Sequence, residues 1–159
     1  MSNYGNGPII FSDISNVTAT PGRNAPELGA RTTNNSKDYL YVYYTGTSTA
    51  NVGLVCVVSA TSGYSVTVSS TTSADLAMGV VVNTAMTTGD YGWLQTRGYC
   101  EVEMITASGT VAAGDLLHLA ADGEFTPVSN ATGSKDNVIG KAMAAIISGD
   151  SGTAYVTIH

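Results

Sequence analysis

The stretch Tyr39-Leu40-Tyr41-Val42-Tyr43-Tyr44 decides the fold class of this chain. Aromatic and branched side chains of this kind favour an extended backbone, so the stretch predicts a β-strand. Alternate side chains of a strand lie on opposite faces, which places Tyr39, Tyr41 and Tyr43 on one face. That tyrosine face could be core, a subunit interface or, together with Trp93, a platform that stacks on sugars; we favour core plus interface.

Short segments of the same kind follow along the whole chain, separated by turns rich in glycine, serine and aspartate. They are Leu54–Val58, Ser65–Ser69, Met78–Asn83, Gly92–Gln95, Tyr99–Ile105, Asp115–Leu119, Glu124–Val128, Val138–Ile147 and Tyr155–Ile158. A helix is an alternative only around residues 141–147, where a strand is preferred. Many short strands at this spacing predict an all-β fold, a compact β-sandwich or β-barrel (β-tulip-like).

Residues recur in the same order after 60 or 61 positions, which predicts an internal repeat. The matched pairs are Tyr39 and Tyr99, Val42 and Val102, Gly53 and Gly114, Gly63 and Gly123, Gly79 and Gly140, Gly89 and Gly149, and Gly92 and Gly152. Glycines mark turns and places where backbones approach closely, so a matched set indicates two copies of one β unit. The copies are predicted at about 37–96 and 97–159.

Residues 1–36 differ from the rest and predict an extended N-terminal arm ahead of a β domain at 37–159. Three of the four prolines fall there, namely Pro8, Pro21 and Pro26. Such a segment buries too little apolar surface to fold alone. The cluster from Pro8 to Phe11 favours an arm that becomes ordered against a partner.

Composition excludes several classes of partner. With 6 basic and 12 acidic residues the net charge is −6, which argues against nucleic-acid binding. No apolar run reaches the roughly 18 residues of a membrane span, and the N-terminus lacks the basic and apolar regions of a signal peptide. Cys56 and Cys100 are therefore predicted to be small buried thiols rather than a disulfide.

The side chains that could carry chemistry form no recognised constellation, so we expect no enzyme, no metal and no cofactor. Glu101 and Glu103 lie two apart on one strand face, and could act as an acid/base pair only if they lined a concave pocket. His118 is flanked by core positions and His159 ends the chain. Neither histidine has the spaced ligands of a zinc site.

Three stretches give the chain a resemblance to the capsid decoration (cement) proteins of tailed bacteriophages. They are Glu27–Arg31 followed by Lys37–Val42, Thr110–Leu117 leading into Ala121–Gly123, and Val138–Ala142 with Ala154–Ile158. The resemblance implies a β domain that is usually trimeric and lies on the outer surface of the virion capsid. It also implies assembly from protein made in the host cytoplasm, and an N-terminal arm that contacts the major capsid protein.

On this interpretation the chain is a structural virion protein that stabilises the shell, and removing residues 1–36 should abolish capsid binding and leave the β domain folded. The residues expected to contact the capsid or a neighbouring subunit are Ile9, Ile10, Phe11, Arg23, Leu28 and Arg31. The alternative is a receptor- or glycan-binding module of a phage fibre or spike, which would use Trp93 and the tyrosine face.

Overall fold

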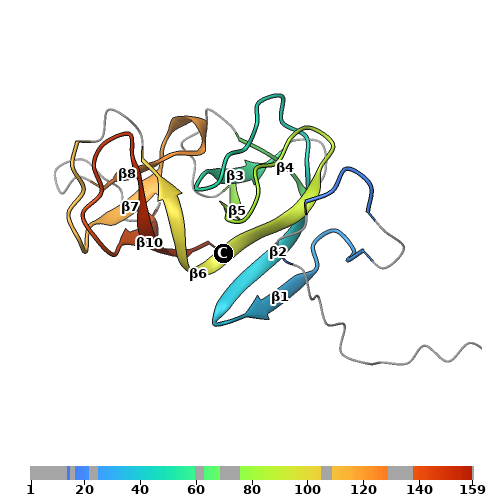
Figure 1. The fold of residues 1–159 in the computed structure, drawn as a ribbon, viewed down its shortest axis with the longest axis horizontal. Helices are drawn as coiled ribbons and strands as arrows, with labels where there is room; N and C mark the ends of the chain where they lie inside the picture. The colour runs from blue at the N-terminus through green and yellow to red at the C-terminus, as the bar shows by residue number, and fades with distance from the viewer. Residues whose placement is uncertain are drawn as a thin grey trace, which may run out of the picture.

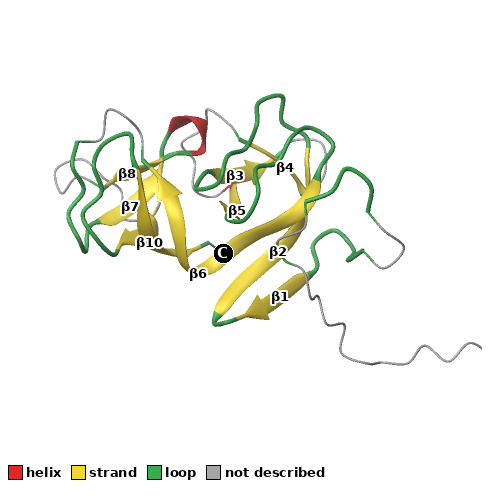
Figure 2. Cartoon of the chain, viewed as in Figure 1, coloured by secondary structure: helices red, strands yellow, loops and turns green. Residues whose placement is uncertain are grey.

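The computed structural model describes residue 14 and residues 17–21, 25–59, 63–68, 76–104, 109–128 and 138–158, and their secondary structure is almost entirely β (Figures 1 and 2). The strands are β1 (Arg31–Asn34), β2 (Lys37–Tyr44), β3 (Val55–Val58), β4 (Ser65–Thr67), β5 (Ala77–Val81), β6 (Tyr91–Glu103), β7 (Leu116–Leu119), β8 (Phe125–Pro127), β9 (Val138–Ala142) and β10 (Ser151–Thr157). One 3₁₀ turn lies at Ala121–Gly123. The predicted all-β class is confirmed.

The first half of the sheet closes on itself as a small barrel. Its strands run in the order β2-β4-β3-β5-β6, and β2 pairs again with β6. The pairing of β2 with β6 is antiparallel and places Leu40 opposite Leu94, whereas β2 and β4 are parallel. Alternate residues of β2 therefore point inward, and Leu40, Val42 and Tyr44 are almost fully buried in the first barrel.

The second half repeats this arrangement beyond the middle of β6. Its strands run in the order β6-β10-β9-β7-β8, and a parallel bridge between Met104 and Phe125 returns β8 to the end of β6. The long strand β6 passes from one barrel into the other, so the two lie side by side (Figure 1). The inner face of the second barrel holds Cys100, Val102 and Met104.

The same pairings recur at the spacing seen in the sequence. The bridge between Ala50 and Met86 has a counterpart between Val111 and Ile146. The pairing register of β3 shifts between Cys56 and Val57, and the register of β7 shifts in the same way between Leu117 and His118. Duplication of one β unit is the interpretation that this pattern favours.

The barrels pack directly against each other. Val55, Val57 and Val80 belong to strands of the first barrel, yet they lie in the core cluster of the second. A Cβ atom at Gly123 would come within 2.6 Å of the carbonyl oxygen of Val55, and the φ of Gly123 is +79°. Glycine at this turn therefore allows the second barrel to approach β3 closely.

Several predicted boundaries are wrong. The segments predicted at Gly92–Gln95 and Tyr99–Ile105 are one strand, because Gly98, with a φ of +105°, bends the chain without ending the strand. The strand predicted at Val138–Ile147 ends at Ala142, and the last strand begins at Ser151 rather than Tyr155.

The predicted boundary between arm and domain at residue 37 also differs from the sheet, which begins at Arg31. Strand β1 lies inside the predicted arm and pairs with β2 across a turn at Asn35 and Ser36. Both turn residues have positive φ, at 49° and 63°. The sequence of β1 is wholly polar and largely exposed, so it carries no hydrophobic alternation to reveal it.

Candidate interaction surface

The N-terminal segment, residues 1–30, is described at residues 14, 17–21 and 25–30, and it covers Tyr39 and Tyr41 of the tyrosine face of β2. Tyr39, Tyr41 and Trp93 are 5%, 4% and 6% exposed and form a cluster outside the first barrel. Ile14 and Ala30 pack against this cluster. Tyr39 and Tyr41 are therefore core, whereas Tyr43 is partly exposed. Trp93 is not available to stack on a sugar, so the glycan-binding alternative loses the residue on which it mainly depended.

Backbone hydrogen bonds hold the segment in place. The amide of Tyr41 donates to the carbonyl of Ala30 at 2.9 Å, and the amide of Gly29 donates to the carbonyl of Tyr41 at 2.9 Å. Thr18 also pairs with Tyr91. The described part of residues 1–36 thus belongs to the folded body rather than to a separate arm.

Two of the six predicted contact residues can be placed. Leu28 is 40% exposed, and Arg31 is exposed on β1. The exposed ring of Tyr64 lies over Gly29, the residue that follows Leu28 in the sequence. Ile9, Ile10, Phe11 and Arg23 lie outside the described residues.

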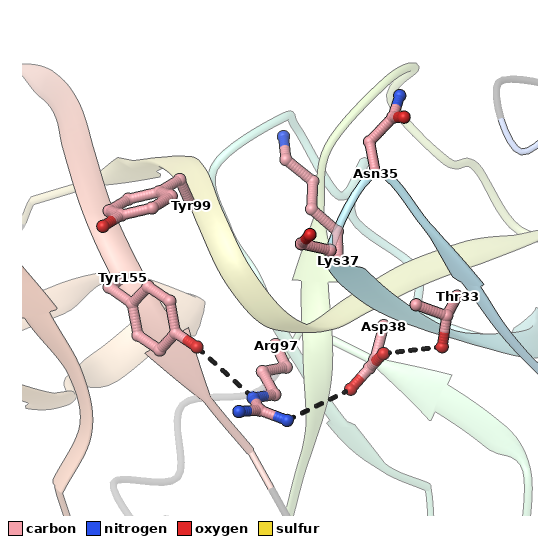
Figure 3. Close-up of a pocket in the computed structure, with 8 residues that line it drawn as sticks. Thr33, Asn35, Lys37, Asp38, Arg97, Tyr99 and Tyr155 are labelled. Carbon is pink, nitrogen blue, oxygen red and sulfur yellow. Dashed lines mark hydrogen bonds and ion pairs between the residues drawn. The ribbon is translucent and has the colours of Figure 1, made fainter.

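A polar and aromatic hollow lies where β1, β2, β6 and β10 meet, at the junction of the barrels (Figure 3). It has a volume of about 310 Å³, and its lining residues are Thr33, Asn35, Ser36, Lys37, Asp38, Arg97, Tyr99 and Tyr155. A second hollow of about 420 Å³ shares Asp38, Arg97 and Tyr155 with it and is also lined by Arg31. We call the two together the junction trough.

A chain of polar contacts crosses the junction trough (Figure 3). The guanidinium of Arg97 donates from Nε to the Tyr155 hydroxyl at 3.3 Å, and its Nη1 lies 4.0 Å from Asp38 Oδ2. The Thr33 hydroxyl donates to Asp38 Oδ1 at 2.8 Å. The rings of Tyr99 and Tyr155 meet edge to face, with centroids 5.1 Å apart. Sequence reasoning missed this site, because its residues come from three separate segments.

Buried Gln95 fixes the backbone beneath the trough. Its amide Nε2 donates to the carbonyls of Arg97 and Tyr99, both at 3.1 Å. These bonds hold the bend in β6 at Gly98, from which the side chains of Arg97 and Tyr99 project. The hydrogen bond to Tyr155, followed by the nearby charge of Asp38, raises the pKa of Arg97.

The remaining candidates for chemistry lie outside the junction trough. Glu101 is exposed on β6, Glu103 is partly buried, and neither lines the junction trough. Burial, then Glu103 and Asp122, raises the pKa of Glu124. In the described part of the chain, no three His, Cys, Asp or Glu side chains are grouped so that they could hold a metal ion. Nor does that part contain a helix long and apolar enough to cross a membrane.

The histidine and cysteine predictions can be compared with the described residues. His118 lies in β7 between buried Leu117 and Leu119, as predicted, whereas His159 is outside the described residues. Cys56 and Cys100 are buried and free, in the cores of different barrels, which confirms the prediction of two thiols. Burial raises the pKa of each thiol to about 12.

Stability is expected to fall as the pH rises above 9, because the ordinary thiol pKa of 9.0 rises to about 12 on folding. Between pH 9.0 and about pH 12 the unfolded chain binds fewer protons than the folded one. The free energy of unfolding should therefore drop by about 1.4 kcal/mol per pH unit for each thiol, with the contribution fully present below pH 9. Urea titrations at increasing pH measure this slope. A Cys56→Ala variant should lose the contribution of one thiol to this slope. An unchanged slope in that variant would contradict the raised pKa of the Cys56 thiol.

The similarity of this chain to known proteins is found at the level of the fold. No family model and no curated protein matches the chain. Among solved structures, the base of the head fiber protein gp8.5 of bacteriophage phi29 matches with a TM-score of 0.54 and 16% sequence identity. The match covers 75% of this chain and 94% of that one. At this identity the likeness establishes a shared fold.

Proposed function

We propose that this chain is a structural protein of a tailed bacteriophage virion that binds the outer surface of the capsid and stabilises the shell. In this proposal the N-terminal segment contacts the major capsid protein, and the protein, made in the host cytoplasm, acts as a trimer. We propose no catalytic role for it.

The observation that carries the proposal is the fold shared with the base of a phage head fiber, nearly all of which is covered by the match. Fold alone does not determine function. Here it agrees with the resemblance of three sequence stretches to capsid decoration proteins, which is independent of the structural comparison. Both lead to a protein on the outside of a phage head.

The placement of the N-terminal segment supports its proposed role. Residues 25–30 lie against the first barrel, where Gly29 and Ala30 pair with Tyr41. Leu28 and Arg31, both exposed, are then held on the body at the base of the segment. Ile14, Thr18 and residues 29–30 already contact the body, so these residues add no ordering entropy against capsid binding.

Cosedimentation with capsids that lack the protein tests the proposal. The purified protein should pellet with such capsids saturably and at a fixed ratio to the capsid subunits. Decorated capsids should then release DNA at a higher temperature than bare ones. The mass from size-exclusion chromatography should correspond to three chains. Pelleting no greater than that of an unrelated protein of similar charge would refute capsid binding.

A further inference from the structure

We propose that the junction trough binds an acidic saccharide. The inference is drawn from the side chains of the trough and does not rest on the capsid-binding function.

The first argument is the exposed aromatic pair. Tyr99 is 52% exposed although it lies on a central strand, and it contacts Tyr155 edge to face. At the matching position of the first barrel, Tyr39 is only 5% exposed beneath the N-terminal segment. The second barrel therefore displays aromatic rings that the first one covers. The face of such a ring packs on the apolar face of a sugar, as in other sites that combine aromatic walls with a few polar groups.

The second argument is that the polar groups beside these rings both donate and accept hydrogen bonds. Arg97 can only donate, whereas the carboxylate of Asp38 can only accept. Asn35 adds an amide and Thr33 a hydroxyl to the lining. Sugar hydroxyls donate and accept, so neighbouring hydroxyls can pair with both the guanidinium and the carboxylate. An acidic peptide lacks this series of neighbouring hydroxyls that could pair with both groups, which disfavours that class of partner.

The third argument is charge. Arg31, Lys37 and Arg97 line the junction trough with Asp38 as the one carboxylate among its lining residues, which leaves two positive charges in excess. The whole chain, in contrast, has a net charge of −6 and only six basic residues. Half of its cations therefore line this trough. This concentration selects a saccharide that carries carboxylate, sulfate or phosphate groups over a neutral one.

The fourth argument is that the groups are already positioned. Gln95 holds the backbone of Arg97 and Tyr99, Tyr155 holds the guanidinium, and Thr33 holds Asp38. Exposed ion pairs of this kind contribute little to stability, so the network is not explained by folding alone. Preorganised groups reduce the entropy lost when a ligand binds.

The test is binding of the full-length protein to an array of acidic oligosaccharides, comprising uronate, sialylated, sulfated and phosphate-bearing chains, with neutral chains of equal length beside them. We expect binding to acidic members that weakens as salt is raised. Tyr99→Ala and Arg97→Gln should each weaken it by about tenfold or more, as loss of one good contact does. Tyr64→Ala removes an exposed aromatic ring outside the trough and is the matched control for Tyr99→Ala.

Tyr155→Phe keeps the ring and removes only the hydroxyl that accepts from Arg97, so it tests the network without a risk to folding. It should weaken binding less than Tyr99→Ala does. The proposal is overturned if no acidic saccharide binds, if neutral chains bind equally well, or if the trough variants bind as the unaltered protein does. Binding of a polyglutamate peptide in place of every saccharide would also overturn it.

Discussion

Replacing Trp93 with alanine should lower the free energy of unfolding by about 3–5 kcal/mol, the usual cost of removing a large buried aromatic side chain. Trp93 is 6% exposed, and its ring lies 5.1 Å from that of Tyr41. The variant would leave a cavity between β6 and the N-terminal segment, and would loosen the contacts of Ile14 and Ala30 with the same cluster. Urea unfolding, followed by circular dichroism, measures the change.

Tyr99→Ala is the matched control for this experiment. Tyr99 lies on the same strand but is 52% exposed, so its removal should cost no more than the aromatic pair contributes, about 0.5–1.5 kcal/mol. If Trp93→Ala were as mild as Tyr99→Ala, the cluster of Tyr39, Tyr41 and Trp93 would not act as a core of its own. If Trp93→Ala kept its stability but lost glycan binding, the sugar-stacking interpretation of Trp93 would be restored.

The parts of the fold that the sequence predicted are those where buried side chains alternate. Strand β2 was recognised because Leu40, Val42 and Tyr44 face a barrel interior. Strand β1 was missed because Arg31 to Asn34 owe their pairing to the backbone of β2, and backbone pairing leaves no trace in the side chains. The continuity of β6 was missed because two separate segments were predicted on either side of Gly98, and glycine usually weakens a strand.

The candidate site was predicted poorly because it depends on tertiary structure. The tyrosine face predicted strand β2 correctly but left the role of its side chains open. Only the packing of Ile14 and Ala30 shows that Tyr39 and Tyr41 are covered. The junction trough joins Asp38, Arg97 and Tyr155, which are distant in sequence and meet through the pairing of β6 with both β2 and β10. No spacing rule brings these residues together.

The second large effect concerns the N-terminal residues, and the structure changes which of them should be removed. Deleting residues 1–36 would remove β1 and Ala30 and expose Tyr39, Tyr41 and Trp93, so the body would be destabilised. These contacts favour a destabilised β domain over the expectation that the domain stays folded after this deletion. Deleting residues 1–13 spares every residue in those contacts and should leave the urea midpoint unchanged.

The most direct test of the account is cosedimentation of this 1–13 deletion with capsids that lack the protein, beside the full chain. Burying Ile9, Ile10 and Phe11 on the capsid would contribute about 1.5–3 kcal/mol each. Backbone pairing with the capsid and avidity from several copies would offset the conformational entropy of ordering the other residues, at about 1–2 kcal/mol each. Loss of the three side chains should then weaken binding by about 100-fold, the equivalent of some 2.8 kcal/mol. The account predicts a folded deletion protein that stays in the supernatant while the full chain pellets. A folded deletion protein that pellets with the capsids as completely as the full chain would contradict it.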